Sequence, residues 1–285
     1  MQLGKKVIQR ILAQGGYQLI RTKQTSLPKR PAAVSPDVQR DFVFKNFENL
    51  AAAYEYALNQ IEGCELLTPN AMRPRLLTRL LGTPPSEAYY ILTALGKTKL
   101  VEGDVCEFGV AQGETSALIA NELASTSKHL HLFDSFEGLP APTPQDQLKD
   151  DIFSLGSIEA YTGTMMTPMD AVLERLAAIS FPATRFTIHR GFIEQTLRQS
   201  QNLPTQVACA YVDFDFYEPI KTALNFLDTV MPRGAIVIVD DYDFFSTGAK
   251  TAVDEFLAQA NAVTPRYEMH VPDTRLGYFC VLTKL

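Results

Sequence analysis

The sequence predicts an α/β fold in which helices cover both faces of a doubly wound, mostly parallel sheet. From residue 103 onward, short apolar runs typical of buried strands alternate with longer amphipathic runs typical of helices. Two more strand-like runs follow the last helix with no helix between them, which predicts a C-terminal antiparallel hairpin at the sheet edge. Helical patterns bounded by proline and glycine precede the first strand and predict an N-terminal helical cap.

The alternation gives five strand–helix units and then the hairpin. The expected strands are residues 104–110, 129–134, 185–189, 207–213 and 235–240, with 267–271 and 277–283 in the hairpin. The expected helices are residues 115–123, 169–179, 192–199, 220–230 and 250–259. Because a helix lies in each connection, the five leading strands are expected to run parallel.

Three segments are expected along the chain. Residues 1–35 form a basic lead and a proline-rich linker. An apolar helix face in the lead is expected to pack on the body or on a second copy, which would give a homodimer, and a membrane-surface helix is the alternative. Residues 36–100 form the helical cap, with one helix from Ser35 to Gly63 and another from residue 83 to Gly96. Residues 101–285 form the α/β domain.

Composition excludes several classes of protein. The 285 residues carry a formal net charge of −6, and the basic clusters are small and N-terminal, so no nucleic-acid partner is expected. No apolar run is long enough for a transmembrane segment, and the N-terminus lacks the apolar core of a signal peptide. The four cysteines (Cys64, Cys106, Cys209 and Cys280) form no C-x-x-C pair, which favours a reducing, cytoplasmic location.

Ligands of open parallel sheets bind beyond the carboxyl ends of the strands, so the residues at these ends are the candidates for ligand binding. The first strand ends in Glu107 and a turn with Gly109 and Gly113, which lets the backbone approach a ligand before a helix begins. Ala111 and Glu114 replace the later glycines of the G-x-G-x-x-G fingerprint, so a nucleoside ligand is favoured over a dinucleotide. An ordinary strand–helix turn is the alternative.

The second strand ends at Asp134, which follows the glycine turn at the distance suited to binding a ribose hydroxyl pair. Asp213 and Asp215 end the fourth strand, and Asp240 and Asp241 end the fifth. Four carboxylates at neighbouring strand ends repel one another unless a cation is present. Oxygen ligands of this kind suit magnesium, calcium or manganese.

The motifs, taken in order, resemble the macrocin O-methyltransferase (TylF/MycF-type) family over about residues 85–285. The runs that carry the resemblance are VEGDVCEFGV (101–110), FDSFEGLP (133–140), VDFDFYE (212–218), VDDY (239–242) and GAKTAVDEF (248–256). Two positions depart from the family pattern: Phe214 replaces a glycine, and Ala111–Gln112 replaces a Trp–Arg pair. Both lie near the expected pocket, so the acceptor remains open.

The resemblance implies a class I methyltransferase, Rossmann-like fold and an S-adenosylmethionine-dependent, Mg²⁺-assisted O-methyltransferase. Its acceptor would be a small molecule, a sugar or natural product, with the methylated hydroxyl one of a vicinal pair. The implied cofactor-binding residues are Glu107, Gly109, Gly113, Ser116, Asp134 and Ser135, and the implied metal ligands are Asp213, Asp240 and Asp241, with Asp215 behind them. The stretch after Asp134 would form part of a lid over the acceptor.

In the expected mechanism, the metal binds two adjacent hydroxyls and lowers the pKa of the one to be methylated. Asp213 or His270 would take the proton. Three alternatives remain: a glycosyltransferase that uses Asp213-Phe214-Asp215 as a D-x-D motif, a nicotinamide oxidoreductase, and a non-catalytic relative. The other histidines lack metal-ligand spacing, and a Ser-His-Asp hydrolase would need a G-x-S-x-G turn that the sequence lacks.

Overall fold

The computed structural model describes residues 49–57, 59–60, 67–68 and 70–285. The chain divides into two units, Met1–Asn46 and Phe47–Leu285, and all described residues belong to the second. The predictions for the basic lead, the linker and both ends of the first cap helix lie outside the described residues. Within that helix, residues 49–57 and 59–60 are helical, as the sequence predicted.

All seven predicted strands are present and join one sheet in the order β3-β2-β1-β4-β5-β7-β6. The strands are β1 Asp104–Phe108, β2 Leu130–Asp134, β3 Phe186–Arg190, β4 Val207–Val212, β5 Ile236–Val239, β6 Tyr267–His270 and β7 Cys280–Lys284. The first five run parallel, and β7 pairs antiparallel with both β5 and β6. The predicted doubly wound sheet with its C-terminal antiparallel hairpin is therefore confirmed.

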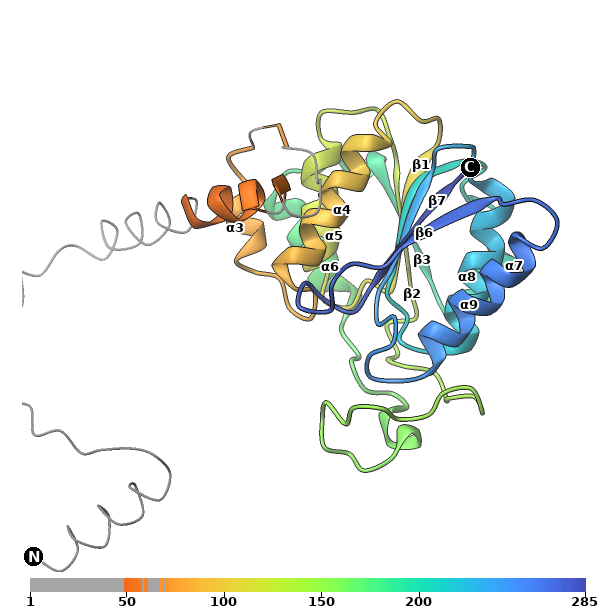
Figure 1. Ribbon diagram of the computed structural model, residues 1–285. Coiled ribbons are helices and arrows are strands. Elements are labelled where there is room, and N and C mark those ends of the chain that lie inside the picture. The colour runs from red at the N-terminus through yellow and green to blue at the C-terminus, as the bar shows by residue number, and fades with distance from the viewer. Residues whose placement is uncertain (1–48, 58, 61–66, 69) are drawn as a thin grey trace, which may run out of the picture. The chain divides into compact units, whose positions relative to one another are not determined.

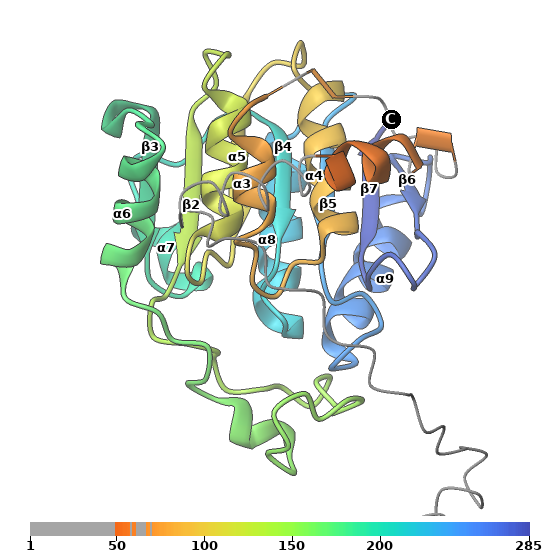
Figure 2. The same cartoon turned by 90° about the vertical axis from the view of Figure 1, so that its left-hand side faces the viewer.

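Helices cover both faces of the sheet (Figures 1 and 2). The α-helices are α3 Arg73–Leu77, α4 Pro85–Lys97, α5 Glu114–Leu123, α6 Met169–Ala178, α7 Ile193–Gln199, α8 Tyr217–Val230 and α9 Gly248–Ala260, with short 3-10 turns at Ile158–Tyr161 and Ala183–Arg185. Helices α4, α5 and α6 lie on one face, and α7, α8 and α9 lie on the other. No helix among the described residues is long and apolar enough to cross a membrane.

Alternation along β1 decides which side chains meet which helices. Val105 packs in the core between the sheet and α5, whereas Cys106 and Phe108 pack toward α8 and α9. Glu107 shares the face of Val105, because successive side chains of a strand point to opposite faces. The polar Glu107 therefore points into a layer built mainly from apolar side chains. The boundaries proposed for the cap, residues 36 and 100, stay predictions, although α4 packs directly on β4, β5 and α5.

The strand order reverses between β1 and β4, and this is the switch point of the sheet. Backbone hydrogen bonds continue past the strand ends here: the Asp213 N–H donates to Phe108 O at 2.7 Å, and the Asp240 N–H donates to Val212 O at 2.8 Å. The first residues after β1, β4 and β5 therefore lie side by side at one edge.

Candidate active site

A pocket of about 530 Å³ opens at the carboxyl ends of the central strands. Its lining joins the glycine turn after β1, Asp134 after β2, the acidic residues after β4 and β5, and the long segment between β2 and α6. These regions are far apart in the sequence, and the parallel order of the strands brings them together. The pocket therefore lies where the fold predicts a ligand.

The turn after β1 is shaped by two glycines. Gly109 has a φ of 85°, and a Cβ on it would stand 1.7 Å from the carbonyl oxygen of Asp213. Gly113 has a φ of 82° and caps the N-terminus of α5. Both positions require glycine, because side chains rarely adopt this backbone conformation and no space is left at Gly109. The predicted tight turn before a helix is present, and its role in cofactor binding stays a prediction.

Asp134 closes the same turn. One carboxylate oxygen accepts hydrogen bonds from the N–H groups of Val110 and Ala111, at 2.7 and 2.9 Å. The other oxygen accepts the Phe136 N–H at 2.7 Å. Ala111 and Phe136 both have positive φ values, so the carboxylate stabilises two strained backbone positions at the pocket wall. Asp134 lines the pocket beside these contacts, where the ribose was predicted to bind.

Glu107 and Ser116 lie beneath the glycine turn and do not line the pocket. Neither side chain is exposed to solvent, and neither the Glu107 carboxylate oxygens nor the Ser116 hydroxyl has a hydrogen-bond partner. Burial above all, opposed by the nearby Ser116 hydroxyl and aided by the Asp134 carboxylate, raises the pKa of Glu107 to about 8. An unpartnered buried carboxylate is costly, so it marks a place where a donor group belongs.

Ser135, the last of the predicted cofactor-binding residues, forms side-chain hydrogen bonds within the turn that follows β2. Its hydroxyl donates to Gly138 O at 3.1 Å and accepts the Glu137 N–H at 3.0 Å. The side chain thereby shapes the start of the segment that follows β2, and the residue also lines the pocket.

Three carboxylates converge at the ends of β4 and β5. Asp213, Asp215 and Asp241 each place an oxygen within 4.8 Å of the others. Asp215 and Asp241 adopt left-handed backbone conformations with φ of 60° and 56°. Aspartate tolerates this conformation better than most residues, and such strain is typical of functional sites. The sequence predicted an acidic cluster here, and the structure adds Asp215 to its inner members.

Asp240, the third predicted metal ligand, turns toward α4. One of its carboxylate oxygens accepts the Tyr211 hydroxyl at 2.8 Å, and the other accepts the Asp241 N–H at 2.8 Å. Glu87 from α4 is completely buried beside the Asp240 carboxylate, and burial and then Asp240 raise the pKa of Glu87. Glu87 could not be identified from the sequence, because a glutamate in the first turn of a helix ordinarily indicates only a favourable interaction with the helix dipole.

The acidic residues of the cluster disfavour one another's charge. Burial and then the neighbouring carboxylates raise the pKa of Asp213 well above its usual value, with Asp240 the largest of those neighbours. The pKa of Asp241 is raised by burial and then by repulsion from Asp215 and Asp240. Burial raises the pKa of Asp240 as well, although the Tyr211 hydroxyl works against this. The arrangement is one that a bound cation would relieve.

His270, the second predicted base, ends β6. That strand runs parallel to β5 but lies two strands away from it in the sheet. The imidazole is exposed and stacks against the Tyr90 ring, with centroids 6.2 Å apart. His270 is not among the residues that line the pocket, so the structure brings Asp213 and not His270 to the cluster.

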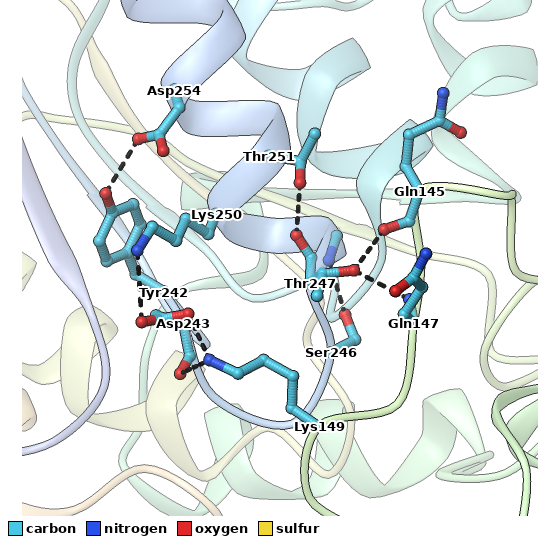
Figure 3. A network of polar contacts seen from close by, with 11 residues as sticks. Gln145, Gln147, Lys149, Tyr242, Asp243, Ser246, Thr247, Lys250, Thr251 and Asp254 are labelled. Carbon is cyan, nitrogen blue, oxygen red and sulfur yellow. Dashed lines mark hydrogen bonds and ion pairs between the residues drawn. The ribbon is translucent and has the colours of Figure 1, made fainter.

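The segment of residues 135–168 extends beyond the sheet and lines the outer part of the pocket (Figure 2). Polar contacts tie it to the loop between β5 and α9 (Figure 3). The Gln147 N–H donates to the Thr247 hydroxyl at 2.9 Å, and that hydroxyl donates to Gln145 O at 2.5 Å. Lys149 forms an ion pair with Asp243, two residues after Asp241. The wall of the pocket and the acidic cluster are thus mechanically connected.

The sheet order, with a glycine turn between β1 and α5 at the switch point, is that of the Rossmann-like fold of class I methyltransferases. The family model for macrocin O-methyltransferase (TylF) matches residues 90–273, so the chain belongs to that family, as the resemblance predicted. It is an S-adenosylmethionine-dependent O-methyltransferase that acts on a small molecule. The glycosyltransferase and oxidoreductase alternatives are thereby set aside.

Solved structures agree on the fold. The chain is similar to the O-methyltransferase NovP, with 20% identity, a TM-score of 0.58, and coverage of 70% of this chain and 80% of NovP. It is also similar to the calicheamicin methyltransferase CalS11, with 19% identity, a TM-score of 0.56, and coverage of 93% of this chain and 99% of CalS11. No curated protein sequence matches the chain significantly.

Proposed function

We propose that the protein methylates one of two neighbouring hydroxyls on a sugar or another natural-product small molecule, with the help of Mg²⁺. The observation that carries the proposal is the convergence of Asp213, Asp215 and Asp241 in the pocket that the glycine turn also lines. The fold relative CalS11 is described as a TDP-rhamnose 3'-O-methyltransferase of calicheamicin biosynthesis, which supports a sugar hydroxyl as the acceptor group.

The residues at the glycine turn fit S-adenosylmethionine. Its ammonium group can supply the donor that the buried Glu107 carboxylate lacks, and the backbone at Gly109 leaves the approach free of side chains. Asp134 stands beside the turn with its carboxylate at the pocket wall and is positioned to accept ribose hydroxyls. The acidic lining also suits a cofactor that carries a positive sulfonium.

The acidic cluster fits a divalent cation of the magnesium type. Its donor set consists of carboxylate oxygens only, which hard cations prefer. Asp213, Asp215 and Asp241 would hold the ion, and Asp240, predicted as a ligand from the family resemblance, would support it through its link to Asp241. When bound, such an ion polarises neighbouring acceptor hydroxyls and eases loss of a proton.

Asp213 is the proposed proton acceptor. It lines the pocket, whereas His270 does not, so it is the one of the two predicted bases that lies at the acceptor site. The residues of segment 135–168 that line the pocket would form part of a lid over the acceptor, and the glycine turn and the acidic cluster would set the approach of the two reactants.

Methyl transfer measured with and without a chelator tests the proposal. Activity on a diol acceptor should require Mg²⁺, and Asp213→Ala should abolish turnover while it leaves binding of S-adenosylhomocysteine largely intact. Full activity of Asp213→Ala, or full activity in the presence of the chelator, would overturn the metal assignment. Asp273→Ala serves as the control, because Asp273 is an acidic residue that lies outside the pocket lining.

A further inference from the structure

A buried tyrosine lies beneath the acidic cluster. Tyr211 is the last but one residue of β4, is only 2% exposed, and packs in the layer between the sheet and α4. In the register of the parallel strands it pairs with Glu107 of β1 and Ile238 of β5, so its side chain shares their face of the sheet. A polar group in such a layer needs hydrogen-bond partners, and the partners of the Tyr211 hydroxyl indicate its role.

The Tyr211 hydroxyl reaches the turn after β5. It donates a hydrogen bond to one carboxylate oxygen of Asp240 at 2.8 Å, and the other oxygen of Asp240 accepts the Asp241 N–H at 2.8 Å. The Asp240 carboxylate is therefore held at both oxygens, by a side chain of β4 at one and by the backbone of a proposed metal ligand at the other. Its orientation is the one that satisfies both donors.

The backbone of Asp241 depends on such support. Its φ of 56° lies in the left-handed region, and a residue other than glycine keeps that conformation only where the surrounding contacts hold it. The Asp241 N–H is bound by the Asp240 carboxylate, and the Asp241 carbonyl oxygen accepts the Phe244 N–H at 3.1 Å. The direction in which the Asp241 side chain enters the acidic cluster therefore depends on the orientation of Asp240.

Thr83 fixes the same phenol from the side of the helices. Its hydroxyl forms a hydrogen bond with the Thr115 hydroxyl at 3.1 Å, and both side chains are buried. Burial and then the Asp240 carboxylate raise the pKa of Tyr211, whereas a hydrogen bond from Thr83 acts in the opposite direction. A buried chain of hydroxyls thus runs from the first turn of α5 to the acidic residues, and Tyr211 joins it to Asp240.

We propose that Tyr211 is a positioning residue for the metal ion, because its hydroxyl orients the Asp241 carboxylate through Asp240. The inference rests on the proposed function, since it concerns the cation that the acidic cluster would hold. Tyr211 does not line the pocket, so it acts through Asp240 and not by contact with either reactant. Loss of its hydroxyl should weaken binding of the cation and leave the glycine turn, which Asp134 holds by separate hydrogen bonds, unchanged.

Calorimetric titration of the full chain with MgCl₂ at saturating S-adenosylhomocysteine tests the inference. Tyr211→Phe should weaken Mg²⁺ binding about tenfold, the effect of one hydrogen bond to a charged group, and should leave the affinity for S-adenosylhomocysteine unchanged. Tyr267→Phe is the matched control, because Tyr267 is a buried strand tyrosine that donates to the Asp228 carboxylate at 3.0 Å and lies outside the pocket lining. Both variants should lose similar stability in urea, and only Tyr211→Phe should lose affinity for Mg²⁺.

A double variant shows whether Tyr211 acts through Asp240. Tyr211→Phe added to Asp240→Ala should weaken Mg²⁺ binding no further than Asp240→Ala alone, because the phenol then has no carboxylate to hold. Equal Mg²⁺ affinity of Tyr211→Phe and Tyr267→Phe, additive losses in the double variant, or weaker S-adenosylhomocysteine binding in Tyr211→Phe would each overturn the inference. Absence of Mg²⁺ binding by the wild-type protein would contradict the proposed function and, with it, the inference.

Discussion

The carbonyl oxygen of Asp213 occupies the space in which a side chain of Gly109 would stand, 1.7 Å from the position of its Cβ. This contact joins the turn that is proposed to bind the cofactor to the strand end that is proposed to bind the metal. The two halves of the site therefore share one backbone contact, and neither can shift without the other.

Gly109→Ala should destabilise the protein by about 3 kcal/mol, because the new methyl group collides with backbone and the residue must keep a positive φ. Urea unfolding measures the change, and binding of S-adenosylhomocysteine should fall with it. Gly96→Ala is the matched control. Gly96 lies in α4 with nothing within 4 Å of the added Cβ, so alanine there should be neutral or stabilise by up to about 1 kcal/mol. Equal stability of the two variants would contradict the close approach.

Glu107 should make the cofactor-free protein less stable at alkaline pH. Its pKa in the folded state, about 8, lies above the ordinary value of 4.5, so the folded state binds the proton more tightly. Stability then falls as the pH rises between these two values and levels off above them. Glu107→Gln should remove this fall and exceed the wild type by on the order of 4 kcal/mol above about pH 8.

The comparison is made by urea unfolding across pH without cofactor, with the exposed Glu102→Gln as the control. The same Glu107→Gln variant should bind S-adenosylhomocysteine more weakly, because it has lost a charged acceptor. Parallel stability curves of wild type and variant from acid to alkaline pH would show that the pKa of Glu107 is not raised in the cofactor-free protein, and would contradict the prediction.

Magnesium should raise the melting temperature more at about pH 8 than at about pH 5.5, because protons compete for carboxylates whose pKa values are raised. Asp213→Asn and Asp241→Asn should abolish the increase. Asp215→Asn should reduce the increase in melting temperature more than Asp240→Asn does, because the Asp240 carboxylate already accepts a hydrogen bond from the Tyr211 hydroxyl. A larger loss in Asp240→Asn than in Asp215→Asn would favour the ligand set that the family resemblance implies. An unchanged increase in melting temperature in all four variants would contradict a metal site at this cluster.

The Thr247 hydroxyl should hold the segment of residues 135–168 against the loop after β5. Thr247→Val loses both hydrogen bonds at almost constant volume, so limited proteolysis within that segment should become faster. Global stability should change by only about 1 kcal/mol. Thr229→Val is the control, because its hydroxyl bonds only to the preceding turn of α8. Identical cleavage rates in the two variants would show that other contacts fix the segment.

The sheet could be predicted from the sequence because each buried strand is a short apolar run and each crossover is an amphipathic helix. The strand ends were equally clear: Gly109, Asp134, Asp213 and Asp241 all line the predicted pocket. Two features could not be predicted. The left-handed backbone at Asp215 brings that side chain inward, and a strand pattern carries no information about such local conformations.

The second feature is Glu87, which meets Asp240 only because α4 packs on β4 and β5. That packing brings together residues more than a hundred positions apart, and no local pattern reports it. The exposure of Phe153 and Met166 is likewise a property of the folded segment and not of its sequence.

Calorimetric titration of the purified protein with S-adenosylhomocysteine, with and without Mg²⁺, decides whether the glycine turn after β1 binds the cofactor. We expect micromolar binding in both conditions, with binding lost or strongly weakened in Glu107→Gln and retained in Asp213→Ala. Absence of binding in both conditions would contradict the assignment of the glycine turn to the cofactor.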